Sequence, residues 1–194
     1  QFPMIDLLWS PDSSRLLTHF IDKRRLKRSP LQLEYVPSDG SLFPRLNAER
    51  RRSYQGDEEA EAWTLLSIDI TTRRRQNIEH SPIPVFYPFY VGYFPTGSAW
   101  WDSDSRHAYC VCQNLERTGT RVLKVDSDTG RVETLFEDAP EQSLKLRPSP
   151  IIGLLALPLP DTQELIWYSE RSGWGHFYLY DLTSGQLKNA ITQG

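Results

Sequence analysis

The acidic side chains that could act together in chemistry lie in one polar stretch of the chain. Glu58, Glu59 and Glu61 follow the pair Gly56-Asp57. Neighbouring carboxylates can transfer protons or hold an ammonium group, so an acid–base or amine-binding site is one interpretation. The surrounding residues are polar and rich in turn-forming types, which favours a solvated acidic loop instead.

Other residue types that commonly carry catalysis are present without the spacing that catalysis needs. The four histidines have no Cys, His or acidic partner at metal-ligand spacing. The chain contains neither a Gly-x-Ser-x-Gly nucleophile elbow nor a glycine-rich phosphate loop. Cys110 and Cys112 stand two apart in a predicted strand, so both side chains face one side and could form a disulfide only poorly. We interpret them as free, buried or half-buried thiols rather than a metal or redox pair, and we expect no catalytic residue, metal or cofactor in this chain.

Charge is nearly balanced, with 22 basic and 25 acidic residues. Three basic runs, at residues 23–28, 50–52 and 73–75, leave nucleic-acid binding as an alternative. Acidic residues in similar number share this part of the chain, so solvated loops and strand edges are favoured and no nucleic-acid partner is expected. The most apolar stretch, residues 151–159, is too short to span a bilayer. No targeting segment is visible, which leaves the localisation open.

The elements that would position any such residues repeat along the chain. Trp-Ser-Pro-Asp-Ser at residues 9–13 returns as Trp-Asp-Ser-Asp-Ser at residues 101–105 and, in reduced form, as Leu-Pro-Asp-Thr at residues 159–162. A second phrase recurs in steps of 57 and 55 residues. Its copies begin at Asp69, Asp126 and Asp181. Self-similarity at such a period indicates a repeat architecture.

Each repeat is predicted to contain about four short strands. A strand follows the first phrase, at residues 15–20, 107–113 and 164–169, where residues alternate in polarity or are aromatic and β-branched. The second phrase predicts a hairpin turn that Gly130 and Gly185 close in the second and third copies. Helix is not expected, because no segment sustains an apolar face at helical spacing and 14 prolines interrupt the chain.

A four-stranded unit at this spacing is typical of a β-propeller blade. The sequence therefore predicts an all-β fold of about three consecutive four-stranded blades, which form an open arc of a larger ring. We expect one partial propeller domain over residues 1–194, with units at about 5–80, 95–140 and 150–194 and an inserted loop at 37–62. Both ends of such an arc would expose strand edges, which favours oligomerisation.

Four segments in this order resemble the N-terminal β-propeller of the dipeptidyl peptidase IV family, in its bacterial form, within the prolyl oligopeptidase class of serine peptidases. They are residues 8–18 with 21–24, residues 54–57 with 65–70, residues 100–105 with 126–130, and residues 166–181. The last is the most specific, because its Ser-Glu-Arg-Ser-Gly-Trp-Gly-His core is similar to a strand pair of the bacterial members. The sequence departs from the family at Asp102 and Ser103, where serine and proline are usual.

The resemblance implies an activity for a longer protein. Family members join an eight-bladed propeller to an α/β-hydrolase domain with a Ser-Asp-His triad, and they release dipeptides with proline or alanine in second position from peptide N-termini. The propeller limits access and supplies two glutamates that hold the substrate's amino group. By this match the glutamates would precede Gln1 and the triad would follow Gly194. Glu58 and Glu59 therefore do not inherit the role, and we expect this chain, without a hydrolase domain, to be inert by itself.

The resemblance also suggests which residues could contact a peptide. Arg147 matches an arginine that lines the extended substrate pocket in some members, although an ordinary surface arginine is the simpler interpretation. Four residues near a predicted hairpin tip could contact substrate or serve only the loop; these are Glu170, Arg171, Trp174 and His176.

The family further implies partners and a location. The partners would be the remaining blades, the hydrolase domain, peptide substrates and another copy of the chain. The location would be periplasmic, otherwise extracytoplasmic, or cytoplasmic in a bacterium. A stand-alone propeller that acts as a binding scaffold remains the alternative.

Overall fold

The computed structural model describes residues 7–22, 24–26, 33–37, 39–46, 62–80, 83–84, 99–113, 119–139 and 156–194. Secondary structure in these ranges is almost entirely β-strand, with one short 3-10 helix at Pro160–Thr162. No helix in these ranges is long and apolar enough to cross a membrane.

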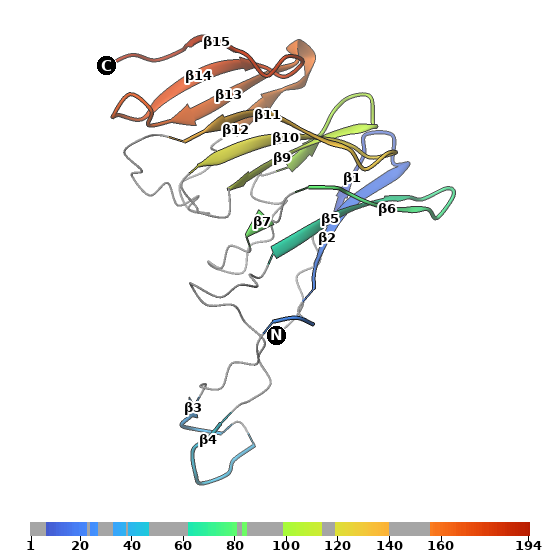
Figure 1. Cartoon of the computed structure of the whole chain (residues 1–194), viewed down its shortest axis with the longest axis vertical. Helices are drawn as coiled ribbons and strands as arrows, with labels where there is room; N and C mark the ends of the chain where they lie inside the picture. The colour runs from blue at the N-terminus through green and yellow to red at the C-terminus, as the bar shows by residue number, and fades with distance from the viewer. Residues whose placement is uncertain are drawn as a thin grey trace.

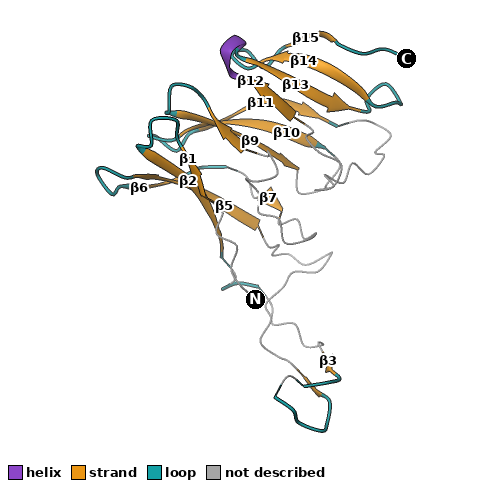
Figure 2. Cartoon of the chain, turned by 180° about the vertical axis from the view of Figure 1, so that it is seen from behind, coloured by secondary structure: helices purple, strands orange, loops and turns teal. Residues whose placement is uncertain are grey.

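Three antiparallel sheets are stacked one on another (Figure 1, Figure 2). The first contains β1 (Leu7–Trp9), β2 (Arg15–Ile21), β5 (Ala62–Asp69) and β6 (Arg75–Asn77), and β7 (Ile83–Pro84) also pairs with β5. The second contains β8 (Ala99–Trp101), β9 (His107–Gln113), β10 (Thr120–Asp126) and β11 (Val132–Asp138). The third contains β12 (Ala156–Leu159), β13 (Glu164–Ser169), β14 (His176–Asp181) and β15 (Leu187–Ala190). In each sheet these four strands lie side by side in chain order, and we call them its first to fourth strands.

Alternation along β9 shows how one sheet supplies two cores. Ala108, Cys110 and Cys112 are buried in the core shared with the first sheet. Tyr109 and Val111 are buried in the core shared with the third sheet. Successive side chains of a strand point to opposite faces, so a sheet with neighbours on both sides must be apolar on both.

In each of the two cores, aromatic or aliphatic side chains from one sheet pack against those of its neighbour. Leu17 and Leu65 of the first sheet contact the second sheet, and Leu165 and Trp167 of the third sheet contact it from the other side. Four-stranded antiparallel sheets that stack face to face, with strands in chain order, are the blades of a β-propeller. The three blades do not close into a ring, so the predicted all-β fold, an open arc of propeller blades, is confirmed.

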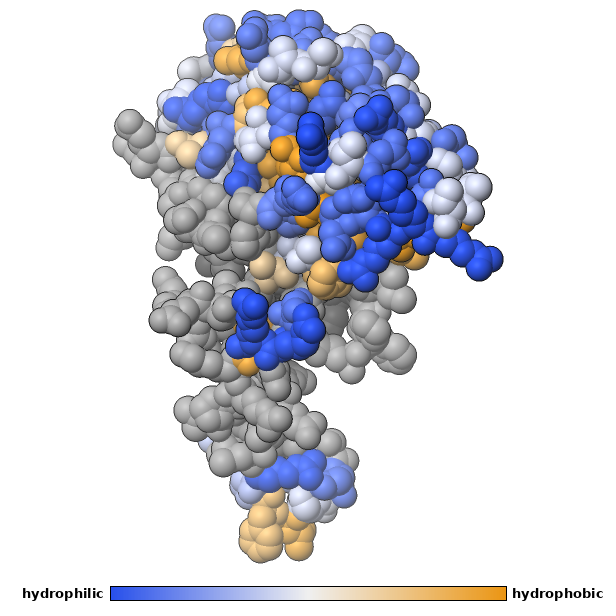
Figure 3. All heavy atoms as spheres, turned by 45° about the vertical axis from the view of Figure 1, so that its right-hand side comes forward, coloured by the Kyte–Doolittle hydropathy of each residue, from blue (hydrophilic) through white to orange (hydrophobic). Residues whose placement is uncertain are grey.

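The connection between β2 and β5 carries a small separate hairpin. β3 (Leu33–Glu34) and β4 (Arg45–Leu46) pair with each other and lie away from the three sheets (Figure 1). Figure 3 shows apolar atoms gathered at the far end of this hairpin, where Val36, Leu42 and Phe43 are exposed. The acidic cluster at residues 58–61 lies outside the described residues.

Candidate functional site

The hairpin between β13 and β14 brings together the residues that the sequence singled out in the third blade. Its tip turns at Gly173, whose amide donates to the carbonyl of Glu170 at 2.9 Å. Gly173 has φ +95°, a conformation that residues with a side chain adopt only at a cost. The Ser-Glu-Arg-Ser-Gly sequence therefore folds as a tight turn, with Ser169 buried at its base.

Glu170 lies against the ring of Tyr168. The Tyr168 hydroxyl donates to Glu170 Oε1 at 3.1 Å, and burial together with this carboxylate raises the pKa of Tyr168. Gly175 makes room for the hydroxyl, because a Cβ there would lie 2.1 Å from Tyr168 Oη. The other carboxylate oxygen, Glu170 Oε2, is buried and has no hydrogen-bond partner among the described residues. An unsatisfied buried oxygen is costly, so this position can accept a donor from a ligand or from a neighbouring part of the protein.

Arg171 joins the third blade to the second. One of its terminal nitrogens lies 3.2 Å from Asp138 Oδ1, at the end of β11, and its guanidinium lies 4.5 Å from the centre of the Tyr178 ring. The indole of Trp167 donates to the other oxygen of Asp138 at 2.8 Å. Because Asp138 is buried, this contact between blades is shielded from water. The carboxylate that Arg171 pairs with is therefore Asp138 of the second blade.

Trp174 and His176 occupy different surroundings on the same hairpin. Trp174 is 76% exposed and covers no other blade in the described part of the chain. His176 is half-buried at the start of β14, and its Nδ1 lies 3.2 Å from Thr192 Oγ1. Trp174 therefore offers an exposed aromatic surface, whereas His176 is tied to the segment that follows β15.

Arg147 lies outside the described residues. The structure thus places Glu170, Arg171 and Trp174 together at one hairpin tip and His176 at its base. Among the described residues no cluster of three or more His, Cys, Asp or Glu side chains could hold a metal ion.

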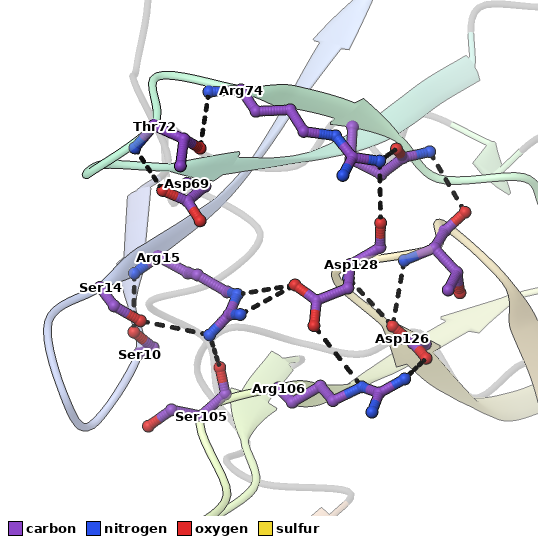
Figure 4. A network of polar contacts seen from close by, with 12 residues as sticks. Ser10, Ser14, Arg15, Asp69, Thr72, Arg74, Ser105, Arg106, Asp126 and Asp128 are labelled. Atoms are coloured by element: carbon purple, nitrogen blue, oxygen red, sulfur yellow. Dashed lines mark hydrogen bonds and ion pairs between the residues drawn. The ribbon is translucent and has the colours of Figure 1, made fainter.

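A polar network at the seam between the first and second blades was missed by sequence reasoning. We use the word seam for the contact between two neighbouring blades. Arg15 reaches Asp128 at 2.8 Å and donates to the carbonyl of Ser105 at 3.1 Å. Arg106 pairs with Asp126 at 2.7 Å and approaches Asp128 at 3.6 Å, so both arginines point toward Asp128 (Figure 4). The sequence offered one signal for this network. The second copy of the phrase has an acidic residue, Asp128, where the third copy has Thr183, so the turn itself does not require a carboxylate at this position.

The network holds the carboxylate of Asp126 in the charged form. Burial acts to raise the pKa of Asp126, but hydrogen bonds from the Arg106 side chain and from the Thr129 and Asp128 amides lower it to about 2. On the first-blade side of the seam, hydrogen bonds from Ser10 and Ser14 hold the pKa of Asp12 well below its usual range. These charges are used in contacts between blades and within turns, which makes the network structural rather than catalytic.

Fold and site together define part of a β-propeller: three stacked blades, a polar network at one seam and one exposed hairpin. The chain belongs to the dipeptidyl peptidase IV family, because the model of the dipeptidyl peptidase IV (DPP IV) N-terminal region matches residues 5–194.

Two solved structures of larger proteins share the fold. One is a protein from Bacteroides ovatus assigned as a dipeptidyl aminopeptidase IV, with 16% identity and a TM-score of 0.66 over 97% of this chain and 26% of that chain. The other is Porphyromonas gingivalis dipeptidyl peptidase 4, with 14% identity and a TM-score of 0.65 over 97% of this chain and 24% of that chain. The chain thus spans about a quarter of the length of either protein.

Proposed function

We propose that this chain is the non-catalytic propeller segment of a dipeptidyl peptidase IV-like serine exopeptidase. The complete enzyme would release Xaa-Pro and Xaa-Ala dipeptides from peptide N-termini, with the propeller limiting access to the catalytic site and shaping it. The observation that carries the proposal is the family match over residues 5–194 in a chain that folds as consecutive propeller blades. The nucleophile, the general base and the amine-binding glutamates would come from other parts of the longer protein.

The β13–β14 hairpin is the part of this chain that we assign to the peptide-facing rim. Trp174 presents an exposed aromatic ring, which can pack against an apolar side chain of a peptide. Glu170 Oε2, which has no partner within the described ranges, can accept a hydrogen bond from a peptide N–H or a cationic group. Arg171 acts as a positioning residue, since its pairing with Asp138 fixes the base of the turn. Arg147 would bind carbonyl oxygens of an extended substrate.

Peptidase assays on two forms of the protein test this proposal. The 194-residue chain alone should not cleave Gly-Pro or Ala-Pro arylamides, whereas the full polypeptide that contains it should. In the full polypeptide, Trp174→Ala and Arg147→Ala should raise KM with little change in kcat, because uniform binding is lost and the reacting groups are untouched. Ser172→Ala, at the same hairpin tip, serves as the matched control. Turnover by the isolated chain, or no cleavage by the full polypeptide, would contradict the proposal.

A further inference from the structure

Asp138, the last residue of β11, is a buried carboxylate, and both of its oxygens contact the third blade. It is 7% exposed. Its Oδ2 accepts a hydrogen bond from the indole of Trp167 at 2.8 Å, and its Oδ1 lies 3.2 Å from a terminal nitrogen of Arg171. Trp167 belongs to β13, whereas Arg171 lies in the turn that follows β13. One side chain of the second blade thus holds both a strand and a turn of the third blade.

Arg171 is directed toward the second blade rather than into solvent. Its Nε donates to Ser169 Oγ at 3.1 Å, and its guanidinium lies 4.5 Å from the centre of the Tyr178 ring and 5.7 Å from that of Tyr180. Phe136 of the second blade stacks on Tyr180, with the ring centres 3.9 Å apart. An arginine that is paired, hydrogen-bonded and placed over aromatic rings has few alternative side-chain orientations. The turn that carries Arg171 is therefore fixed relative to the second blade.

The tip of this hairpin depends on that contact for its position. Strand pairing between β13 and β14 ends at Ser169 and His176, so residues 170–175 lie beyond the sheet. Within the described ranges, the contact of Arg171 with Asp138 is the one ion pair or hydrogen bond that joins this tip to another blade. A turn without strand pairing moves readily unless other contacts restrain it, so this contact decides how precisely the tip is placed.

The pair of Arg15 and Asp128 provides a contrast. It also joins two blades, at 2.8 Å, and its carboxylate belongs to the same β10–β11 hairpin as Asp138. Asp128, however, lies in the turn that precedes β11, whereas Asp138 is at the far end of that strand. Loss of the Arg15–Asp128 pair should therefore loosen a seam at the end away from the β13–β14 hairpin.

We propose that Asp138 of the second blade is a positioning residue for the peptide-facing hairpin of the third blade. By holding Arg171 it fixes the tip that carries Glu170 and Trp174, and it thereby sets the affinity for extended peptides. Asp138 itself contacts no substrate. The inference rests on the proposed function, because it takes the β13–β14 hairpin as part of the peptide-facing rim.

The mobility of the tip can be measured without any enzymatic assay. A nitroxide attached through Ser172→Cys in the 194-residue chain reports this mobility, because the two native thiols are buried and stay unlabelled. In this background Asp138→Asn keeps an acceptor for the Trp167 indole but removes the charge that holds Arg171. The electron paramagnetic resonance lines should narrow, since the tip moves faster, and Arg171→Gln should narrow them to the same extent. The two substitutions together should give no further change. Asp128→Asn is the matched control and should leave the lines unchanged.

The kinetics of the full polypeptide connect the tip to the substrate. Asp138→Asn should raise KM for an Ala-Pro peptide of about ten residues by about threefold or more, with kcat unchanged, because binding is weakened and the reacting groups are untouched. The rise should be smaller for an Ala-Pro arylamide, which offers fewer groups to the rim. Asp128→Asn should change neither constant.

Each outcome decides the inference. Unchanged lines in both Asp138→Asn and Arg171→Gln would overturn it, as would equal narrowing in Asp128→Asn, which would indicate a general loosening of the blades. Narrowed lines with an unchanged KM for the long peptide would overturn it as well, because the tip would then move without consequence for binding. If the full polypeptide cleaves no Ala-Pro substrate while the lines still narrow in Asp138→Asn, the proposed function is rejected and the positioning of the tip by Asp138 stands.

Discussion

The carbonyl oxygen of Asn77 leaves no room for a side chain at Gly130, since a Cβ there would lie 2.3 Å from it. The two residues belong to neighbouring blades, and the Gly130 carbonyl in turn accepts the amide of Glu79 at 2.8 Å. Gly130 is therefore required twice, once for its positive φ of +77° and once for the close approach of two blades.

Replacing this glycine should separate the two requirements. Gly130→Ala should lower the free energy of unfolding by about 1–2 kcal/mol for the left-handed backbone and by about 1–3 kcal/mol more for the steric conflict at the seam. Gly173→Ala is the control, because Gly173 also has positive φ but no atom of the described residues lies within 4 Å of an added Cβ. Urea unfolding of both variants measures the difference. Equal losses would show that the blades can move apart at no cost.

At the seam between the second and third blades, replacing Asp138 should lower the free energy of unfolding more than replacing any other buried polar residue there. Asp138→Ala leaves the Trp167 indole and the Arg171 guanidinium without their shared acceptor, which should cost about 3–5 kcal/mol. The double variant Asp138→Ala with Arg171→Met should recover part of this loss, because the unpaired charge is gone. A double-mutant cycle with denaturant unfolding measures the coupling. Additive effects would mean that the pair contributes nothing across the seam.

Acid should lower the stability contributed by the seam between the first and second blades in a defined pH range. Folding lowers the pKa of Asp126 to about 2, from an unfolded value of about 3.9. Its contribution to stability is therefore complete above about pH 5 and is lost progressively as the pH falls from about 4 toward 2. Urea midpoints across this range should fall more steeply for the parent than for Asp126→Asn, which starts less stable at neutral pH. Parallel curves for the two proteins would contradict this assignment.

The two cysteines should be chemically silent in the folded protein. Burial raises the pKa of the Cys110 thiol well above its usual range and also raises that of Cys112, whose Sγ accepts a hydrogen bond from Arg121 Nε at 3.4 Å. We expect no reaction with a thiol reagent at pH 8 until denaturant opens the core, followed by rapid modification of both. Fast modification without denaturant would mean that the first core opens readily.

The strand pattern could be read from sequence because it depends on local properties. The predicted strands at residues 107–113 and 164–169 coincide with β9 and β13, and the strand predicted at 15–20 ends one residue later in β2. Turn phrases with Asp, Ser and Gly predict hairpins, because these residues form hydrogen bonds with the nearby backbone. The recurrence of these phrases about every 55 residues then indicates repeated blades. The grouping of Glu170, Arg171 and Trp174 at one tip followed from the same short-range rules.

The contacts across the seams could not be read in this way. Arg15 and Asp128 are 113 residues apart, and nothing in either local sequence names the other as its partner. The local sequence around Arg171 does not single out its carboxylate partner, which is Asp138 on the blade before. Which side chains meet depends on how two finished sheets stack.

By itself the sequence determined the all-β class, the three repeats and the family, because hydrophobic alternation and turn chemistry act between residues that are close along the chain. Only the tertiary structure decided that Gly130 and Gly185 are also contact points between blades, and that Asp138 of the second blade pairs with Arg171 of the third. The physical reason is that close packing is a property of two surfaces, and the second surface comes from a distant part of the chain.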